Sequence, residues 1–143
     1  MRNVSGLNRD KVLRLLGILD EALAELVNIR RIEKADVLSS RDRFALEDLF
    51  YRLGMAAIDI CFHVAAKSGG KVPGTYKDCF AELVSLGFLD PALADKLKEL
   101  AGLRNVIAHM YWDVDYSQLY DFLSDLECVQ DFRGMVLKLL DNR

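Results

Sequence analysis

The apolar residues of the first segment recur at alternating steps of four and three. Between about Leu7 and Ile32, the positions that follow this spacing are Val12, Leu16, Leu19, Leu23 and Leu26. Steps of this size place side chains on one narrow stripe of an α-helix. The pattern therefore predicts a long amphipathic first helix.

A second helix is expected after the charged segment EKADVLSSRDR, residues 33–43, with Ser39 or Ser40 as its cap. From Leu53 to Ala66 it is apolar nearly all round. Such a helix must be covered on more than one side, and a second subunit is a candidate cover beside its own bundle. The helically spaced apolar positions that we expect it to bury are Phe44, Leu49, Leu53, Ala57, Ile60 and Val64.

The segment SGGKVPGT, residues 68–75, is the clearest break in the chain. Gly69 and Gly70 are suited to end a helix, and Thr75 is placed to cap a short helix over about 76–86 that stops at Gly87. The GGK triplet lacks both the GxxxxGK[ST] spacing and a preceding strand, so a phosphate-binding loop is not indicated.

Two further helices follow. Asp90 and Pro91 suit a cap and first-turn proline for a helix through ADKLKELAGLRNVIA. Asp115, with Gln118 three residues on, resembles a capping box for a last helix over about 116–140. Because neither strand alternation nor an internal repeat is found, we expect an all-α, up-and-down antiparallel bundle of about five helices, forming one domain over 1–143.

Composition agrees with this class and limits the function. The chain has 143 residues, of which 52% are hydrophobic, 29% are charged and two are proline. Its net charge of −3 gives no global basic field, so any nucleic-acid contact must be local. Residues 112–131 hold six acidic residues and no basic one, a segment that would repel RNA or attract a basic protein unless it is an ordinary solvated helix face.

The three cysteines, Cys61, Cys79 and Cys128, are far apart in sequence and form no CxxC. They indicate free thiols in a reducing compartment and neither a disulfide framework nor a zinc knuckle. Charge interrupts the apolar residues of the N-terminus, and no uncharged apolar segment reaches transmembrane length. We therefore expect a soluble, cytoplasmic protein without a membrane partner.

The segment RNVIAHMYW, residues 104–112, contains the candidate chemistry. Histidine moves protons near neutral pH and arginine binds phosphate oxygens, so Arg104 and His109 together suit phosphodiester cleavage without a metal. On one ideal helix, however, they would lie about 140° apart. Either the helix ends before His109, or the pair is completed across a dimer. The alternative role for both is structural, with Arg104 paired to a carboxylate and His109 closing a helix C-terminus.

The longer segment GLRNVIAHMYWDVD resembles the signature of the HepT-like branch of HEPN domains, in which an arginine, four residues, a histidine, one residue and a tyrosine stand at the junction of two helices. The resemblance extends over VPGTYKDCFAELVSLGFLDPALADKLKELAGLRN and the apolar second helix, and covers most of residues 5–140.

This resemblance implies the toxin of a type II-like toxin–antitoxin module, paired with an MNT-type nucleotidyltransferase antitoxin. It also implies a metal-independent, cofactor-free endoribonuclease that acts as a homodimer around a shared cleft. Arg104 would bind the scissile phosphate, His109 would act as general acid or base, and Asn105 would orient them. The RNA 2′-OH would be the nucleophile and would leave a 2′,3′-cyclic phosphate. Tyr111 matches the tyrosine that the antitoxin modifies with AMP in some members, which would block RNA by size and charge.

Other residues have two interpretations each. Asp59 and His63 are neighbours at i and i+4, either as a polar pair that satisfies itself or as part of a metal site that lacks a third ligand. The basic residues around the first loop could guide RNA or form a solvated helix end; they are Arg30, Arg31, Lys34, Arg41 and Arg43. The aromatic residues could stack bases or pack at helix junctions; they are Tyr51, Tyr76, Trp112, Tyr116 and Tyr120.

Two other functions remain open at this level. The same fold could be a non-catalytic module that binds a nucleotide or a protein, or it could chiefly serve as the substrate of its nucleotidyltransferase. RNA cleavage in EDTA distinguishes the first from a nuclease, and intact-mass analysis after co-expression tests the second.

Overall fold

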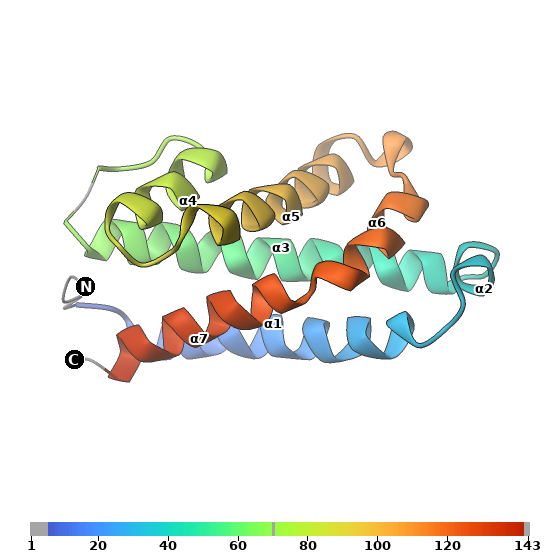
Figure 1. The fold of residues 1–143 in the computed structure, drawn as a ribbon, viewed down its shortest axis with the longest axis horizontal. Helices are drawn as coiled ribbons and strands as arrows, with labels where there is room; N and C mark the ends of the chain where they lie inside the picture. The colour runs from blue at the N-terminus through green and yellow to red at the C-terminus, as the bar shows by residue number, and fades with distance from the viewer. Residues whose placement is uncertain (1–5, 70, 142–143) are drawn as a thin grey trace.

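The computed structural model describes residues 6–69 and 71–141, which form helices, turns and loops without a β-strand. The helix α3 lies between α1 on one side and α4 and α5 on the other, and α7 runs beside α1 (Figure 1). The all-α bundle expected from the sequence is therefore confirmed. The elements are α1 (Arg9–Arg30), α2 (Lys34–Leu38), α3 (Asp42–Lys67), α4 (Tyr76–Ser85), α5 (Pro91–His109), η1 (Tyr111–Asp113), α6 (Tyr116–Phe122), η2 (Leu123–Asp125) and α7 (Glu127–Asp141).

Side-chain caps fix three of the helix starts expected from the sequence. Thr75 Oγ1 accepts from the Asp78 N–H at 3.1 Å, and Asp90 Oδ1 accepts from the Leu93 N–H at 2.8 Å. Asp115 Oδ1 accepts from the N–H of Gln118 at 3.1 Å. Each bond satisfies a backbone donor that has no partner within its own helix.

Glycine ends two helices in the left-handed backbone region, with φ of 71° at Gly69 and 84° at Gly87. Residues with a Cβ adopt this conformation only at a cost. The helix-ending role expected of Gly70 lies outside the described residues.

The first loop differs from the expectation. The segment 33–43 is not simply a connection, because it contains the short helix α2. Arg41 is the N-cap of α3 and makes no side-chain capping bond, whereas Ser40 Oγ accepts from the Asp42 N–H at 3.2 Å. Phe44, expected in the core, is 52% exposed.

The expected continuous helix over 116–140 is wrong, because η2 divides it into α6 and α7. At the break, the carbonyl of Leu123 accepts from Arg30 Nη1 at 3.4 Å and the carbonyl of Asp121 accepts from Ser124 Oγ at 2.9 Å. The break lets α6 pack on α2 and α3 while α7 packs on α1 and α5. The apolar spacing continues through η2, so periodicity did not reveal it.

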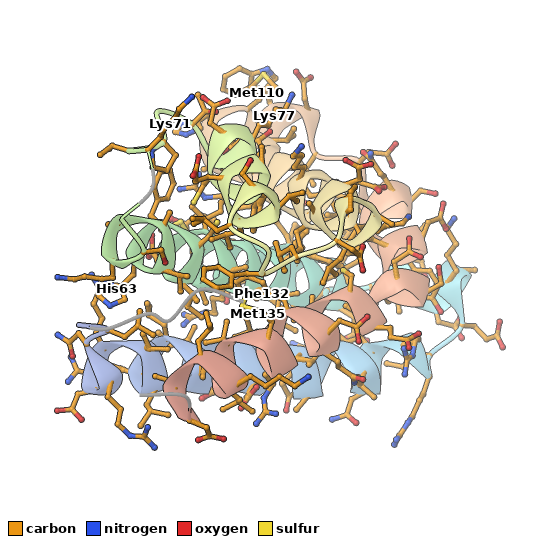
Figure 2. The ribbon with its side chains drawn as sticks, turned by 60° about the vertical axis from the view of Figure 1, so that its left-hand side comes forward. His63, Lys71, Lys77, Met110, Phe132 and Met135 are labelled. Atoms are coloured by element: carbon orange, nitrogen blue, oxygen red, sulfur yellow. The ribbon has the colours of Figure 1, made fainter. Side chains whose placement is uncertain are left out.

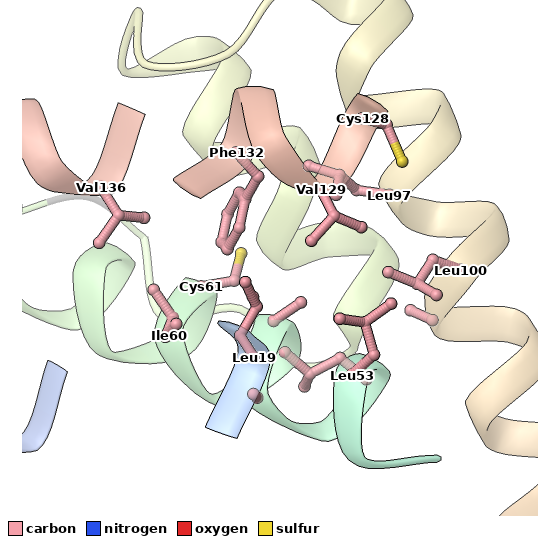
Figure 3. Close-up of a cluster of buried hydrophobic side chains, with 14 of the residues drawn as sticks. Leu19, Leu53, Ile60, Cys61, Leu97, Leu100, Cys128, Val129, Phe132 and Val136 are labelled. Carbon is pink, nitrogen blue, oxygen red and sulfur yellow. The ribbon is translucent and has the colours of Figure 1, made fainter. Parts of the chain in front are cut away.

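The core lies between α1, α3, α5 and α7 (Figure 3). Phe132 of α7 is fully buried and contacts Phe80 of α4 edge to face, and Met135 points into the bundle from the same helix (Figure 2). One described helix, α3, is long and apolar enough to cross a membrane by length and composition. Its most apolar window is 56% buried against neighbouring helices, as expected for the central helix of a bundle.

Candidate functional site

The helix α5 continues through His109, which is its last residue. The Met110 N–H still bonds the Val106 carbonyl at 2.8 Å, and η1 begins at the next residue. The alternative in which the helix ends before His109 is therefore not observed. On ideal helix geometry, the positions of Arg104 and His109 on α5 are about 140° apart around the helix axis.

The guanidinium of Arg104 is held by neutral groups. Its Nε donates to Met55 Sδ at 2.9 Å, and its Nη1 donates to Asn105 Oδ1 at 2.7 Å. Its Cζ lies 5.9 Å from the centroid of the Tyr51 ring. No carboxylate of residues 6–69 or 71–141 forms an ion pair with it, so the structural role as an ion-pair partner is not observed. Its positive charge is positioned but not neutralised, which suits it to bind an anion.

The close approach of α3 and α5 positions Arg104. A Cβ atom on Gly54 of α3 would lie 2.6 Å from the Arg104 Cβ, a separation that real side chains do not adopt. Gly54 therefore permits the contact that brings Tyr51 and Met55 to the guanidinium. Sequence reasoning missed Gly54 and Met55, although a glycine inside a helix usually has a packing reason. It named Tyr51 as a residue for base stacking or packing, but not as a neighbour of Arg104.

His109 is exposed at the C-terminal end of α5. The carbonyl end of a helix favours a cation, so this position fits the structural role described for His109. Beyond it, Tyr111 and Trp112 on η1 are 70% and 68% exposed, with their rings in edge-to-face contact at 5.3 Å between centroids. Tyr111 is thus accessible to a modifying enzyme.

Asp59 and His63 do not form the self-satisfying pair expected from their spacing. His63 Nε2 accepts from the Asn8 backbone N–H at 3.0 Å, and Asp59 is exposed. Burial, and next Lys11 and Lys67, lower the pKa of His63 below its usual value. His63 therefore acts as an acceptor at the start of α1, near the edge of the bundle (Figure 2). In the part of the chain that the structure describes, no group of three or more His, Cys, Asp or Glu side chains is arranged so that it could hold a metal ion.

Most of the other candidate aromatic residues have packing roles. The Tyr116 hydroxyl donates to Glu47 Oε1 at 2.9 Å, and the Tyr120 hydroxyl donates to the Ile32 carbonyl. Burial, and next the bond to Glu47, raise the pKa of Tyr116. Tyr76 is half-buried against the core. Trp112 is the candidate that remains largely exposed.

An open groove of about 330 Å³ lies between α1 and α3. It includes Tyr51 and Met55, the two side chains of α3 that contact the guanidinium. Its floor is largely apolar, and Ile18 of α1 is 41% exposed on it. Its lining residues are Leu15, Ile18, Asp48, Tyr51, Arg52, Met55, Ala56 and Asp59.

Known proteins resemble this chain in both sequence and fold. The chain is 31% identical over 125 residues to a tRNA nuclease HepT of Aphanizomenon flos-aquae, which covers 87% of this chain and 83% of that protein. The structure of a cytosolic protein of unknown function, YutE of Bacillus subtilis, matches with a TM-score of 0.83 at 23% identity, over 99% of this chain and 94% of YutE.

A tri-AMPylated HEPN toxin of Shewanella oneidensis, solved in complex with an MNT antitoxin, matches with a TM-score of 0.75 at 16% identity, over 92% of this chain and 97% of that toxin. The family model described as ribonuclease HepT-like matches residues 19–136, which include the whole of RNVIAHMYW. The chain therefore belongs to the HepT-like family.

Proposed function

We propose that this protein is the toxin of a toxin–antitoxin module and cleaves RNA without a metal or other cofactor, as a homodimer in which Arg104 and His109 act together. The observation that carries the proposal is the guanidinium of Arg104, whose positive charge has no ion-pair partner among the described residues and which is held by Met55 and Asn105. Arg104 is on the same helix, α5, as the exposed His109. The HepT nuclease relative and the family assignment support the reaction class.

Each reaction centre combines two chains. Because the two side chains diverge by about 140° on one helix, His109 of one chain meets Arg104 of the other across a twofold axis. The groove between α1 and α3 supplies the apolar surface for this contact between subunits, since Ile18 is exposed there. Tyr51 and Met55 line the groove and also contact Arg104. A twofold contact of this kind would place two such centres in one shared cleft.

The chemistry uses the RNA itself as the nucleophile. The 2′-oxygen attacks the adjacent phosphorus as its proton passes to a base, and the bond from phosphorus to the 5′-oxygen breaks as that oxygen takes up a proton. His109 acts as general acid or base in these transfers, and Arg104 stabilises the charge that develops on the phosphate oxygens. Asn105 fixes the guanidinium through the 2.7 Å bond. The products are a 2′,3′-cyclic phosphate and a 5′-hydroxyl, and DNA lacks the attacking group.

The activity is silenced at Tyr111. An MNT-type nucleotidyltransferase antitoxin transfers AMP from ATP to its hydroxyl, two residues beyond His109. The tyrosine oxygen loses its proton and bonds the α-phosphorus as the bond to the leaving pyrophosphate breaks. The side chain is 70% exposed and so presents the hydroxyl to an enzyme. The added phosphodiester places a bulky anion beside the cleft, where it repels RNA. A cytoplasmic location follows from the substrate and from the partner enzyme.

Incubation of the purified protein with single-stranded RNA in EDTA tests the proposal. We expect fragments whose terminal phosphate resists phosphatase until acid opens the cyclic ester, and no cleavage by Arg104→Ala or His109→Ala. His63→Gln is the matched control, because His63 is the other of the two histidines and its ring accepts from the Asn8 N–H at the start of α1. Intact RNA with the wild-type protein would instead indicate a binding module.

A further inference from the structure

A second pair of an arginine and an aromatic side chain, Arg43 and Phe44, lies at the start of α3. The Arg43 guanidinium lies 4.4 Å from the centroid of the Phe44 ring, and Phe44 is 52% exposed. The Phe44 ring also contacts Tyr116 edge to face, with 6.2 Å between centroids. An arginine over an exposed phenylalanine is therefore fixed at the start of α3, beside the start of α6.

This pair repeats the arrangement at the candidate site. Phe44 and Tyr51 are seven residues apart on one continuous helix, so they share a face and are separated by about 10 Å along its axis. Tyr51 has Arg104 over its ring, as Phe44 has Arg43. A few nucleotides of single strand cover such a separation.

The charges around Arg43 leave it free to bind an anion. Its Nη1 donates to the neutral Ser40 carbonyl at 2.9 Å, and no carboxylate of the described residues forms an ion pair with it. On the next turn of α3, Glu47 accepts from the Tyr116 hydroxyl and Asp48 pairs with Arg52 at 2.8 Å, and neither carboxylate forms an ion pair with Arg43. An anionic ligand thus meets a cation at this point in a protein whose net charge is −3.

We propose that Arg43 and Phe44 form a subsite for one nucleotide of single-stranded RNA, with the phosphate on Arg43 and the unpaired base on the exposed Phe44 ring. The subsite rests on the proposed ribonuclease function and adds a substrate class to it, because a base inside a duplex cannot reach an aromatic face. A strand bound here continues along α3 to Tyr51 and places a later phosphate at Arg104.

Binding of a labelled RNA tests the subsite. The probe is a fluorescein-labelled 12-nucleotide single strand of mixed sequence, measured by anisotropy with the full chain carrying His109→Ala so that the RNA stays intact. We expect Phe44→Ala to weaken binding of the single strand about tenfold, and Phe44→Tyr to retain most of the binding of the parent protein. Neither substitution should change the binding of a duplex of the same sequence. Arg43→Gln should weaken binding and lower the slope of log Kd against log salt by about 0.7, the loss of one phosphate contact.

Leu13 and Arg14 of α1 are the control, because they are an exposed apolar side chain beside an exposed arginine on another helix. Leu13→Ala and Arg14→Gln should leave single-strand binding unchanged. If Phe44→Ala bound the single strand as tightly as its parent while the wild-type protein still cleaved RNA, the subsite would be wrong and the proposed function would stand. If the wild-type protein neither bound nor cleaved RNA, both would be wrong.

Two further outcomes would also overturn the subsite. A loss of dimer on Phe44→Ala, seen by sedimentation, would assign the side chain to the contact between subunits. A loss of the complex with the nucleotidyltransferase, with RNA binding intact, would assign it to that protein.

Discussion

Gly54 of α3 and Arg104 of α5 approach so closely that a Cβ on Gly54 would lie 2.6 Å from the Arg104 Cβ. The contact is between backbone-proximal atoms, so a rotamer change cannot relieve it. The same crossing brings Tyr51 and Met55 to the guanidinium. The position of the candidate anion-binding group therefore depends on a glycine of another helix.

Gly54→Ala should destabilise the fold and displace Arg104. Insertion of a methyl group into a packed contact costs about 1–3 kcal/mol, which exceeds the roughly 1 kcal/mol that alanine gains over glycine in a helix. Urea unfolding measures the free energy of unfolding, and the RNA assay in EDTA measures the loss of cleavage. Gly17→Ala on α1 is the control, because nothing lies within 4 Å of its added Cβ, and it should be neutral or stabilising. Equal effects of the two substitutions would contradict this account.

The start of α1 should weaken as His63 is protonated. The pKa of His63 in the folded protein lies below its ordinary value of 6.5, so the folded state favours neutral imidazole, which accepts from the Asn8 N–H. Its contribution to stability is complete above pH 6.5 and is lost as the pH falls through the lower folded-state pKa. The difference in the free energy of unfolding between wild type and His63→Gln should shrink over that interval. A difference that is constant with pH would show that this bond does not titrate.

The three cysteine thiols should resist modification in the native protein. Cys61 and Cys79 are fully buried with their Sγ atoms 2.6 Å apart, and Cys128 is 7% exposed. Burial raises the pKa of Cys61, and burial with Asp125 raises that of Cys128 to about 12, so thiolate is scarce. Ellman's reagent should detect no fast thiol until denaturant is added, and then three. A rapidly reacting native thiol would mean that one of these helices opens readily.

Co-expression with an MNT-type nucleotidyltransferase tests the switch at Tyr111. Intact-mass analysis should show AMP-sized additions that Tyr111→Phe abolishes. Tyr120→Phe should retain them, because the Tyr120 hydroxyl donates to the Ile32 carbonyl and is already engaged. Additions that persist in Tyr111→Phe would move the modification to another residue.

The sequence predicted the features that depend on local chemistry. The caps at Thr75, Asp90 and Asp115 form as expected because each needs only its own first turn. The break at η2 was missed because the apolar spacing continues through it and because the bond from the distant Arg30 to the Leu123 carbonyl is not visible in a local pattern. The contact of Cys61 with Cys79 was missed for the same reason, since it requires α3 to pack on α4.

The sequence predicted the site residues of the motif, but not the side chains of other helices that surround them. The motif placed Arg104 and Asn105 side by side, and the structure joins them by a hydrogen bond. The contributions of Gly54, Tyr51 and Met55 depend on how α3 crosses α5, which no local pattern specifies. The roles of Arg104, His109 and Tyr111 remain predictions.

Mixing of two inactive variants tests the central claim most directly. In a dimer of one Arg104→Ala chain and one His109→Ala chain, a centre built across two chains retains one intact pair of Arg104 and His109. After subunit exchange at equal concentrations, half of the dimers are mixed, and each mixed dimer has one of its two reaction centres intact. Cleavage in EDTA should therefore recover to about a quarter of the wild-type rate. If each centre belonged to a single chain, no mixed dimer would contain a complete pair, and the mixture would remain as inactive as either variant alone.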